Sequence, residues 1–242
     1  GLPSLFVTNY EAEKHALYQN DWKPGDDPDL KFMLEMGIYQ PQTRSRFIWN
    51  YLVAPLFGLR VPAYLWFVLK DRLLGNLFDR RFRNETLALL LVHAACIAVA
   101  SVTGWVWELF AYWYLPFLTS FGVIGWLSEL SEHFPLMSAK GNDPIYESRN
   151  RRYAAWPERL LIGMHGDHLH LTHHLLPGIP HWNLAAATEI LREDTEFRAW
   201  DDLWGGIFTA QDGAISMIGY VIKLHKFSDE RVTKLGAIGA FS

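Results

Sequence analysis

Two long stretches without charged side chains most constrain how this chain can fold. Residues 109–127 form an uncharged run of nineteen residues, and residues 87–103 form one of seventeen that contains His93 but no Asp, Glu, Lys or Arg. Each run is close to the length, about 20 residues, that a helix needs to cross the hydrocarbon core of a bilayer. The connector, residues 104–108, carries two Trp, a residue type enriched at membrane–water interfaces. The pattern predicts two transmembrane helices joined by a tight connector, which is a helical hairpin.

Basic residues flank this hairpin on both sides and are absent from its connector. The positive-inside rule therefore places both flanks in the cytoplasm and residues 104–108 on the other side of the membrane. A soluble protein with a buried hairpin is the alternative, and the charge asymmetry argues against it. The basic residues are Arg72, Arg80, Arg81 and Arg83 before the first run and Lys140, Arg149, Arg151, Arg152 and Arg159 after the second.

The sequence upstream of the hairpin is less regular. Residues 47–69 are apolar but are broken by two prolines, by Gly58 and by Arg60. Because a charge in the middle of a span is costly, we expect short helices over residues 47–75 that lie in the interface or re-enter it, with a buried segment of a soluble core as the alternative. The sequence begins without Met and without the charged n-region of a signal peptide, so we expect that its beginning was removed or not recorded.

The composition excludes several classes of protein and site. The net charge of −4 and the pI of about 6.2 give no electrostatic footprint for nucleic acid. The single cysteine, Cys96, excludes a disulfide within the chain and a cysteine-ligated metal cluster. The chain has ten histidines, and five of them lie within ten positions: His165, His168, His170, His173 and His174. The pattern after Trp156 predicts a helix that carries this cluster, and a second helical pattern follows over residues 184–197.

The last three of these histidines have the spacing i, i+3, i+4. Since such positions share one face of a helix, the imidazoles of His170, His173 and His174 are expected to converge. Neutral imidazole is a common ligand of iron, zinc and copper, and the absence of nearby cysteine favours an all-nitrogen iron or zinc site. A solvated histidine-rich turn, or histidines satisfied in a core, is the alternative. The pair Glu132-His133 follows the second apolar run, so the topology puts His133 on the same cytoplasmic face.

These residues resemble the C-terminal half of the membrane fatty-acid desaturase family, whose superfamily includes alkane hydroxylases and carotenoid ketolases. Residues 170–184 carry the motif H-x-x-H-H, then P-x-x-P and a leucine. The Glu132-His133 pair is similar to the additional histidine motif of the alkane hydroxylase and rhizopine-catabolism branches. Residues 10–30 are similar to the family's second histidine box, and with the basic segment 60–75 the resemblance covers most of residues 1–191. The second-box positions that fit are His15, Gln19, Asp27, Pro28, Asp29 and Leu30.

The resemblance implies an activity and a cofactor. In that family, histidines from three boxes on the cytoplasmic side bind two irons, which activate dioxygen to abstract hydrogen from an unactivated C–H bond. Electrons come from a ferredoxin, rubredoxin or cytochrome, and the substrate is an acyl chain, alkane or other lipid in a water-excluding channel. The implied iron ligands in this chain are His15, His133, His170, His173 and His174, with Glu11, His165 and His168 as weaker candidates.

The second box departs from the family pattern. Residues 11–15 should read H-x-x-H-H, but only His15 matches, and Glu11 and Lys14 occupy the other two histidine positions. A protonated Lys14 beside two irons would oppose metal binding. The first box, H-x-x-x-H, does not occur upstream of this segment. Three interpretations stay open: an enzyme whose first box precedes residue 1, a catalytically degenerate relative that serves as a structural subunit, or a chain that binds one metal for another purpose.

We therefore predict an all-α integral membrane protein that forms one desaturase-like domain over residues 1–242. The expected function is iron- and O₂-dependent oxidation of a lipid or hydrocarbon C–H bond in a bacterial inner membrane, with the C-terminus cytoplasmic. The alternative is a structural subunit of a larger membrane complex. Expected partners are membrane lipid, a lipid-like substrate, a ferredoxin- or rubredoxin-type electron donor, and, for the alternative, other subunits. The expected parts are a second-box region 8–32, interfacial helices 47–75, a transmembrane hairpin 87–127, a cytoplasmic cap 128–197 and a tail 198–242.

Overall fold

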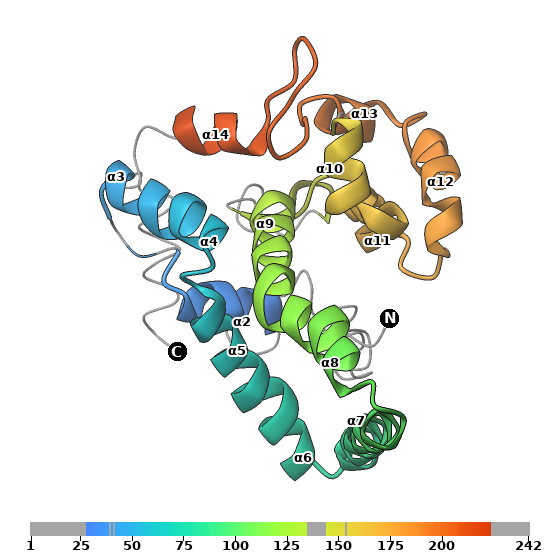
Figure 1. Cartoon of the computed structure of the whole chain (residues 1–242). Coiled ribbons are helices and arrows are strands. Elements are labelled where there is room, and N and C mark those ends of the chain that lie inside the picture. The colour runs from blue at the N-terminus through green and yellow to red at the C-terminus, as the bar shows by residue number, and fades with distance from the viewer. Residues whose placement is uncertain (1–27, 39, 41, 135–143, 153, 224–242) are drawn as a thin grey trace.

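The structure is a computed structural model, and it describes residues 28–38, 40, 42–134, 144–152 and 154–223. The regular elements of this part of the chain are helices, and its one bridge between extended segments joins Trp204 to Ile215 (Figure 1). The predicted all-α class is confirmed for the described residues. The division of residues 1–242 into named parts of one domain stays a prediction.

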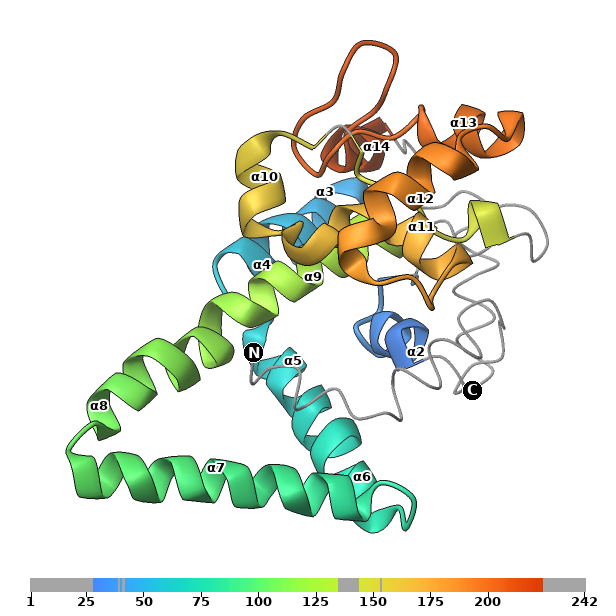
Figure 2. The ribbon, with the colours of Figure 1, turned by 90° about the vertical axis from the view of Figure 1, so that its right-hand side faces the viewer.

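The two uncharged runs form the two longest helices of the described chain. Helix α7 spans Arg83–Thr103, and a second continuous helix spans Val106–His133. Both are long and apolar enough to cross a membrane, which confirms the predicted hairpin. They meet at Gly104, whose φ of 78° ends α7 with the left-handed cap that glycine adopts without strain (Figure 2). The second helix consists of α8 (Val106–Leu109), the π-helical turns η4 (Phe110–Tyr114) and η5 (Phe117–Phe121), and α9 (Gly122–His133).

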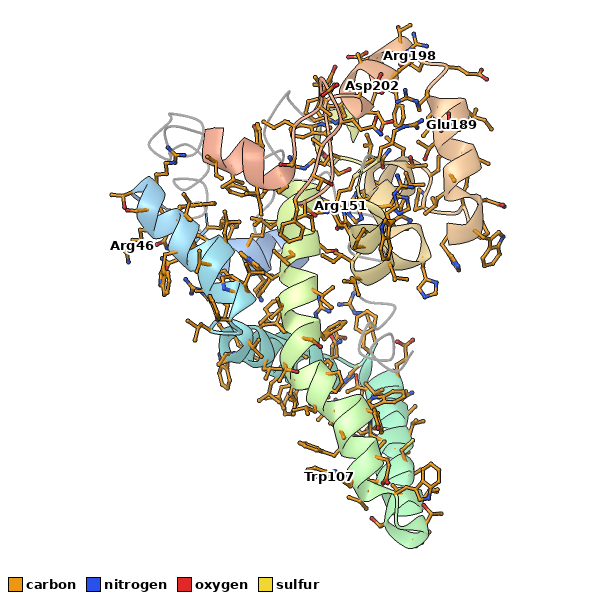
Figure 3. All side chains as sticks on the ribbon, turned by 45° about the horizontal axis from the view of Figure 1, so that its top comes forward. Arg46, Trp107, Arg151, Glu189, Arg198 and Asp202 are labelled. Carbon is orange, nitrogen blue, oxygen red and sulfur yellow. The ribbon has the colours of Figure 1, made fainter. Side chains whose placement is uncertain are left out.

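The hairpin separates an apolar end from a polar one. Figure 3 marks Trp107 at the connector and Arg151 at the opposite end, where a cap of short helices meets the last turns of α9. Side chains along the hairpin stay exposed, and Val102 and Trp107 are 85% and 72% exposed. Such apolar exposure suits contact with lipid, because a soluble surface rarely presents large apolar patches.

The chain before the hairpin folds into two bent helical segments, 44–56 and 61–78. They meet at 82°, and Gly58, with φ of 71°, lies at the break. Trp49 and Trp66 are exposed on them and Phe57 is exposed at the break, as expected of helices that lie in or re-enter a membrane interface. Their elements are α3 (Arg44–Phe47), η2 (Ile48–Val53), α4 (Ala54–Leu56), α5 (Val61–Phe67), η3 (Val68–Gly75) and α6 (Asn76–Phe78), and α2 (Pro28–Glu35) precedes them.

An aromatic core fixes the C-terminal end of α9. Trp126 stacks on Tyr51 at 5.9 Å between ring centroids, and its indole Nε1 donates a 2.8 Å hydrogen bond to the Tyr51 carbonyl oxygen. One residue beyond the helix, Phe134 is fully buried and stacks on Phe47 at 5.3 Å. Because these contacts bracket the end of α9, they also set the position of His133.

The cap differs from its prediction in two places. The helix expected to carry all five clustered histidines is broken, because His165 and Gly166 adopt φ of 60° and 82°. The helix expected over residues 184–197 ends at Leu191, and a new one begins where the Asp194 carboxylate accepts hydrogen bonds from two backbone N–H groups. The cap elements are η7 (Pro144–Tyr146), α10 (Trp156–Leu161), η8 (Met164–Leu169), α11 (His170–Leu175), η9 (His181–Asn183), α12 (Leu184–Leu191), α13 (Thr195–Asp201) and α14 (Met217–Lys223).

Candidate metal centre

Three histidines from two helices converge where α9 meets the cap. His133 is the last residue of α9, and His170 and His174 lie one turn apart on α11. Nε2 of His170 is 2.8 Å from Nε2 of His133 and 2.7 Å from Nε2 of His174. His133 and His174 are buried and His170 is half-buried, so this imidazole group is largely withdrawn from water.

Polar contacts of the cap hold α11 in this position. Asn150 lies in the segment before α10 and is fully buried. Its amide nitrogen donates to Thr172 Oγ1 at 3.2 Å and to Asp201 Oδ1 at 2.9 Å, and its carbonyl oxygen accepts from the Thr172 backbone N–H at 3.2 Å. Thr172 Oγ1 also lies 2.7 Å from Thr188 Oγ1 on α12. Thr172, which lies between the two converging histidines of α11, is therefore tied directly to Asn150 and to α12, and through Asn150 to α13.

The remaining predicted ligands lie outside this group or outside the described residues. The His173 ring is exposed, with its centroid 6.2 Å from that of His170 and 6.0 Å from that of His174. The cause is the helical repeat: His174 lies on the same face of α11 as His170, whereas His173 is turned by about 100° from His174 around the helix axis. His165 packs its ring on His181 at 5.0 Å. His15 and Glu11 lie outside the described residues.

His168 also faces away from the imidazole group. Its Nδ1 lies 3.3 Å from the Gly163 carbonyl oxygen, and burial lowers the pKa of its imidazole. The ring lines a polar pocket of about 300 Å³ together with Arg152, Arg159 and Glu189. His168 thus occupies a different environment from the converging histidines.

A cluster of charges lies directly behind His170. Glu132, Asp167 and His170 bring ligand atoms within 4.8 Å of one another, as a metal-binding group would. However, Arg151 already supplies the cation: its Nη2 is 2.6 Å from Glu132 Oε1 and 2.7 Å from Asp167 Oδ2. The second carboxylate oxygen of Glu132 lies 3.5 Å from His170 Nδ1. Arg151 and Asp167 are not among the site residues predicted from the sequence, in which Arg151 is only one of the basic flanking residues.

The donor set of the imidazole group fits one transition-metal ion. The Nε2 atom of His170 has one lone pair or one proton to serve two neighbouring ring nitrogens, so hydrogen bonding alone satisfies the arrangement poorly. A metal about 2.0–2.1 Å from each nitrogen would hold them roughly 3.0–3.4 Å apart, which requires only a slight opening of the group. Three neutral imidazoles suit iron, zinc, copper or nickel.

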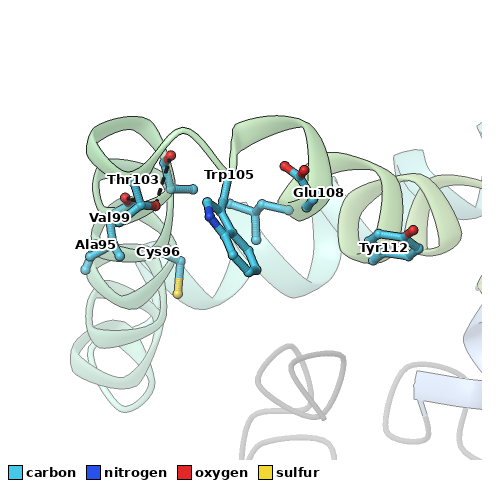
Figure 4. A pocket seen from close by; sticks show the side chains of 9 residues that line it. Ala95, Cys96, Val99, Thr103, Trp105, Glu108 and Tyr112 are labelled. Carbon is cyan, nitrogen blue, oxygen red and sulfur yellow. Dashed lines mark hydrogen bonds between the residues drawn. The ribbon is translucent and has the colours of Figure 1, made fainter.

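An apolar pocket of the hairpin lies far from this group. It has a volume of about 580 Å³ and lies at the corner between α7 and α8, where Cys96, Val99, Trp105 and Tyr112 are among its lining residues (Figure 4). A helix from Val106 to His133 is roughly 40 Å long at 1.5 Å per residue. A molecule confined to this pocket is therefore far from the histidines.

A membrane-spanning helical hairpin with histidines gathered at its polar end is an arrangement of membrane proteins that can bind a metal. Comparison with known proteins identifies the family. The family model described as fatty acid desaturase matches residues 7–201, so the chain belongs to the fatty acid desaturase family. Proteins of this family are membrane-bound, typically use iron and act on lipids.

A curated relative agrees with this assignment. The chain is 33% identical over 198 residues to dihydrorhizobitoxine desaturase of Bradyrhizobium elkanii. The alignment covers 80% of this chain and 55% of that protein, so the chain spans about half the length of its relative. No solved structure matches the chain.

Proposed function

We propose that this chain is part of an iron-dependent oxidoreductase that uses O₂ to desaturate or hydroxylate a C–H bond of a lipid-like or hydrocarbon substrate. The observation that carries the proposal is the convergence of His133, His170 and His174 at the polar end of the hairpin. Membership of the desaturase family and the likeness to a named desaturase support it. Because the chain spans about half of that relative, the complete activity is proposed for a protein that contains this chain.

The parts of this structure would have different roles in the reaction. Iron held by the three imidazoles would activate O₂, the oxidant that the removal of hydrogen from an unactivated C–H bond requires. His133 and His174 are buried, which keeps bulk water and stray reductants from the site. The exposed apolar faces of the hairpin would hold the substrate within the membrane. A ferredoxin- or rubredoxin-type protein would deliver electrons from the cytoplasmic side.

A degenerate relative that serves as a structural subunit of a membrane complex is the second candidate. The observation in its favour is the second box, where Glu11 and Lys14 stand at histidine positions and only His15 matches. In the described part of the chain, one all-imidazole group is available, enough for one metal rather than two. Such a subunit would keep the hairpin and the cap because packing requires them.

Metal analysis distinguishes these candidates. The full chain, purified without chelator and reconstituted with Fe²⁺ under anaerobic conditions, is expected to retain at least one iron per chain after desalting. The measurement is elemental analysis by mass spectrometry against protein concentration. Two irons per chain would exclude the structural-subunit candidate, and a chain that retains none would contradict the proposed iron site.

We also propose that the chain lies in a bacterial inner membrane with its histidines and cap in the cytoplasm. A Trp105→Cys variant in a Cys96→Ser background is expected to react with a membrane-impermeant maleimide in intact spheroplasts, because Trp105 is 66% exposed at the connector. A Glu193→Cys variant, exposed in the cap, is expected to react only in inside-out vesicles. The reverse labelling pattern would contradict the orientation.

A further inference from the structure

A buried charge network joins the last turn of α9 to the segment before α11. Arg151 is 1% exposed and Glu132 is 3% exposed. The Arg151 guanidinium bridges the carboxylates of Glu132 on α9 and Asp167 on η8, and Asp167 also accepts a 3.1 Å hydrogen bond from Ser128 Oγ. The network therefore connects α9, which ends at His133, to η8, the segment that leads directly into His170 at the start of α11.

The two oxygens of Glu132 have different neighbours. Oε1 lies 2.6 Å from Arg151 Nη2, whereas Oε2 faces His170 Nδ1 at 3.5 Å. The other ring nitrogen of His170, Nε2, faces His133 and His174. A carboxylate beside Nδ1 favours the tautomer that carries its proton there, which leaves the Nε2 lone pair directed at the imidazole group.

We propose that Glu132 and Arg151 are positioning residues for the metal centre: Glu132 orients the His170 imidazole and fixes its tautomer, and Arg151 holds Glu132 in place. The inference rests on the proposed function, since it requires a metal at the imidazole group. Neither residue is a ligand in this arrangement.

The charge balance explains why an arginine occupies this place. A carboxylate as buried as that of Glu132 is costly unless a cation and hydrogen bonds compensate it. Arg151 provides both, because its Nη2 lies within hydrogen-bond distance of the Glu132 and the Asp167 carboxylates.

Co²⁺ binding to the full chain in detergent tests the inference, with the visible ligand-field bands of Co²⁺ as the readout. Glu132→Ala and Arg151→Met are each expected to weaken Co²⁺ binding by about 10–100-fold, the range for outer-sphere partners of metal-bound histidine. Arg151→Lys, which keeps the cation, is expected to restore most of the affinity. Arg152→Met is the matched control, because Arg152 is adjacent in sequence but pairs with the exposed Glu189.

Further measurements separate positioning from a structural role. The effects of Glu132→Ala and Arg151→Met are expected to be non-additive in the double variant, since both act through His170. Glu132→Gln keeps the volume of the side chain, and it is expected to shift the Co²⁺ bands while the thermal midpoint stays near that of the wild type. If Glu132→Ala unfolds the cap, the Glu132→Gln variant tests whether Glu132 positions His170.

The outcomes distinguish this inference from the proposed function. A wild-type chain that binds no Co²⁺ overturns the metal site and the inference together. A wild-type chain that binds Co²⁺, with Glu132 and Arg151 variants of unchanged affinity and spectrum, overturns the inference alone. Tighter Co²⁺ binding in Arg151→Met would also overturn it, because Glu132 and Asp167 would then act as ligands of their own.

Discussion

A His170→Ala variant is expected to lose measurable iron binding while the hairpin and cap remain folded. His170 is the central member of the imidazole group, with its Nε2 2.7 Å and 2.8 Å from the ring nitrogens of His174 and His133. Removal of the His170 imidazole leaves the ring nitrogens of His133 and His174 without the nitrogen that lies close to both. Since loss of an outer-sphere partner already costs about 10–100-fold in affinity, loss of this ligand is expected to cost more than roughly 100-fold.

The measurement is iron per chain after anaerobic reconstitution, together with circular dichroism to verify folding. His181→Ala is the matched control, because His181 is exposed and packs on Trp182 and His165 outside the group. A His170→Ala chain that keeps the iron content of the control would remove the imidazole group from consideration. His173→Ala adds a second comparison: a loss equal to that of His170→Ala would mean that His173 turns inward when metal binds.

The transmembrane hairpin could be predicted from sequence because its cause is local. Long uncharged runs such as residues 109–127 have few structural solutions, and the connector at Gly104 requires only a residue that tolerates positive φ. Pairing of His170 with His174 was also local, since it follows from helical spacing. The break at His165 could not be predicted, because the helical pattern of the sequence continues through this residue whereas the backbone leaves the helical conformation there.

The environment of the histidines could not be predicted, since it depends on contacts distant in sequence. Asn150 and Asp201 are 51 residues apart, and Arg151 meets Glu132 across 19 residues. In the sequence, Arg149 and Arg151 appear as ordinary members of a basic flank. A count of charges gives the side of the membrane but not which arginine is buried against a carboxylate and which is solvated.

An Arg149→Met variant is expected to destabilise the cap strongly. Arg149 is 2% exposed, and its guanidinium donates to the backbone carbonyls of Ser131 and Phe134 at the end of α9. The guanidinium also lies over the Trp204 ring, 4.4 Å from its centroid. The last carbonyls of a helix have no partner within the helix, so Arg149 acts as the C-terminal cap that joins α9 to the segment before α14.

Methionine keeps most of the volume of Arg149 but donates no hydrogen bond, so two buried carbonyls lose their partner. At about 1–3 kcal/mol for each buried polar group left unsatisfied, the expected cost is roughly 3 kcal/mol. For a chain of this size that corresponds to a fall in thermal midpoint of about 6–12 °C. Thermal unfolding in detergent, followed by circular dichroism, measures the change, and Arg198→Met at an exposed position of α13 is the matched control.

The same variant links stability to the metal centre. His133 lies between the two residues whose carbonyls Arg149 caps, so an end of α9 that frays removes one of the three imidazoles from the group. Arg149→Met is therefore expected to lose iron at temperatures below its unfolding midpoint, whereas Arg198→Met is expected to lose iron only on unfolding. Coincident loss of iron and helicity in Arg149→Met would show that the end of α9 does not open separately from the rest of the cap.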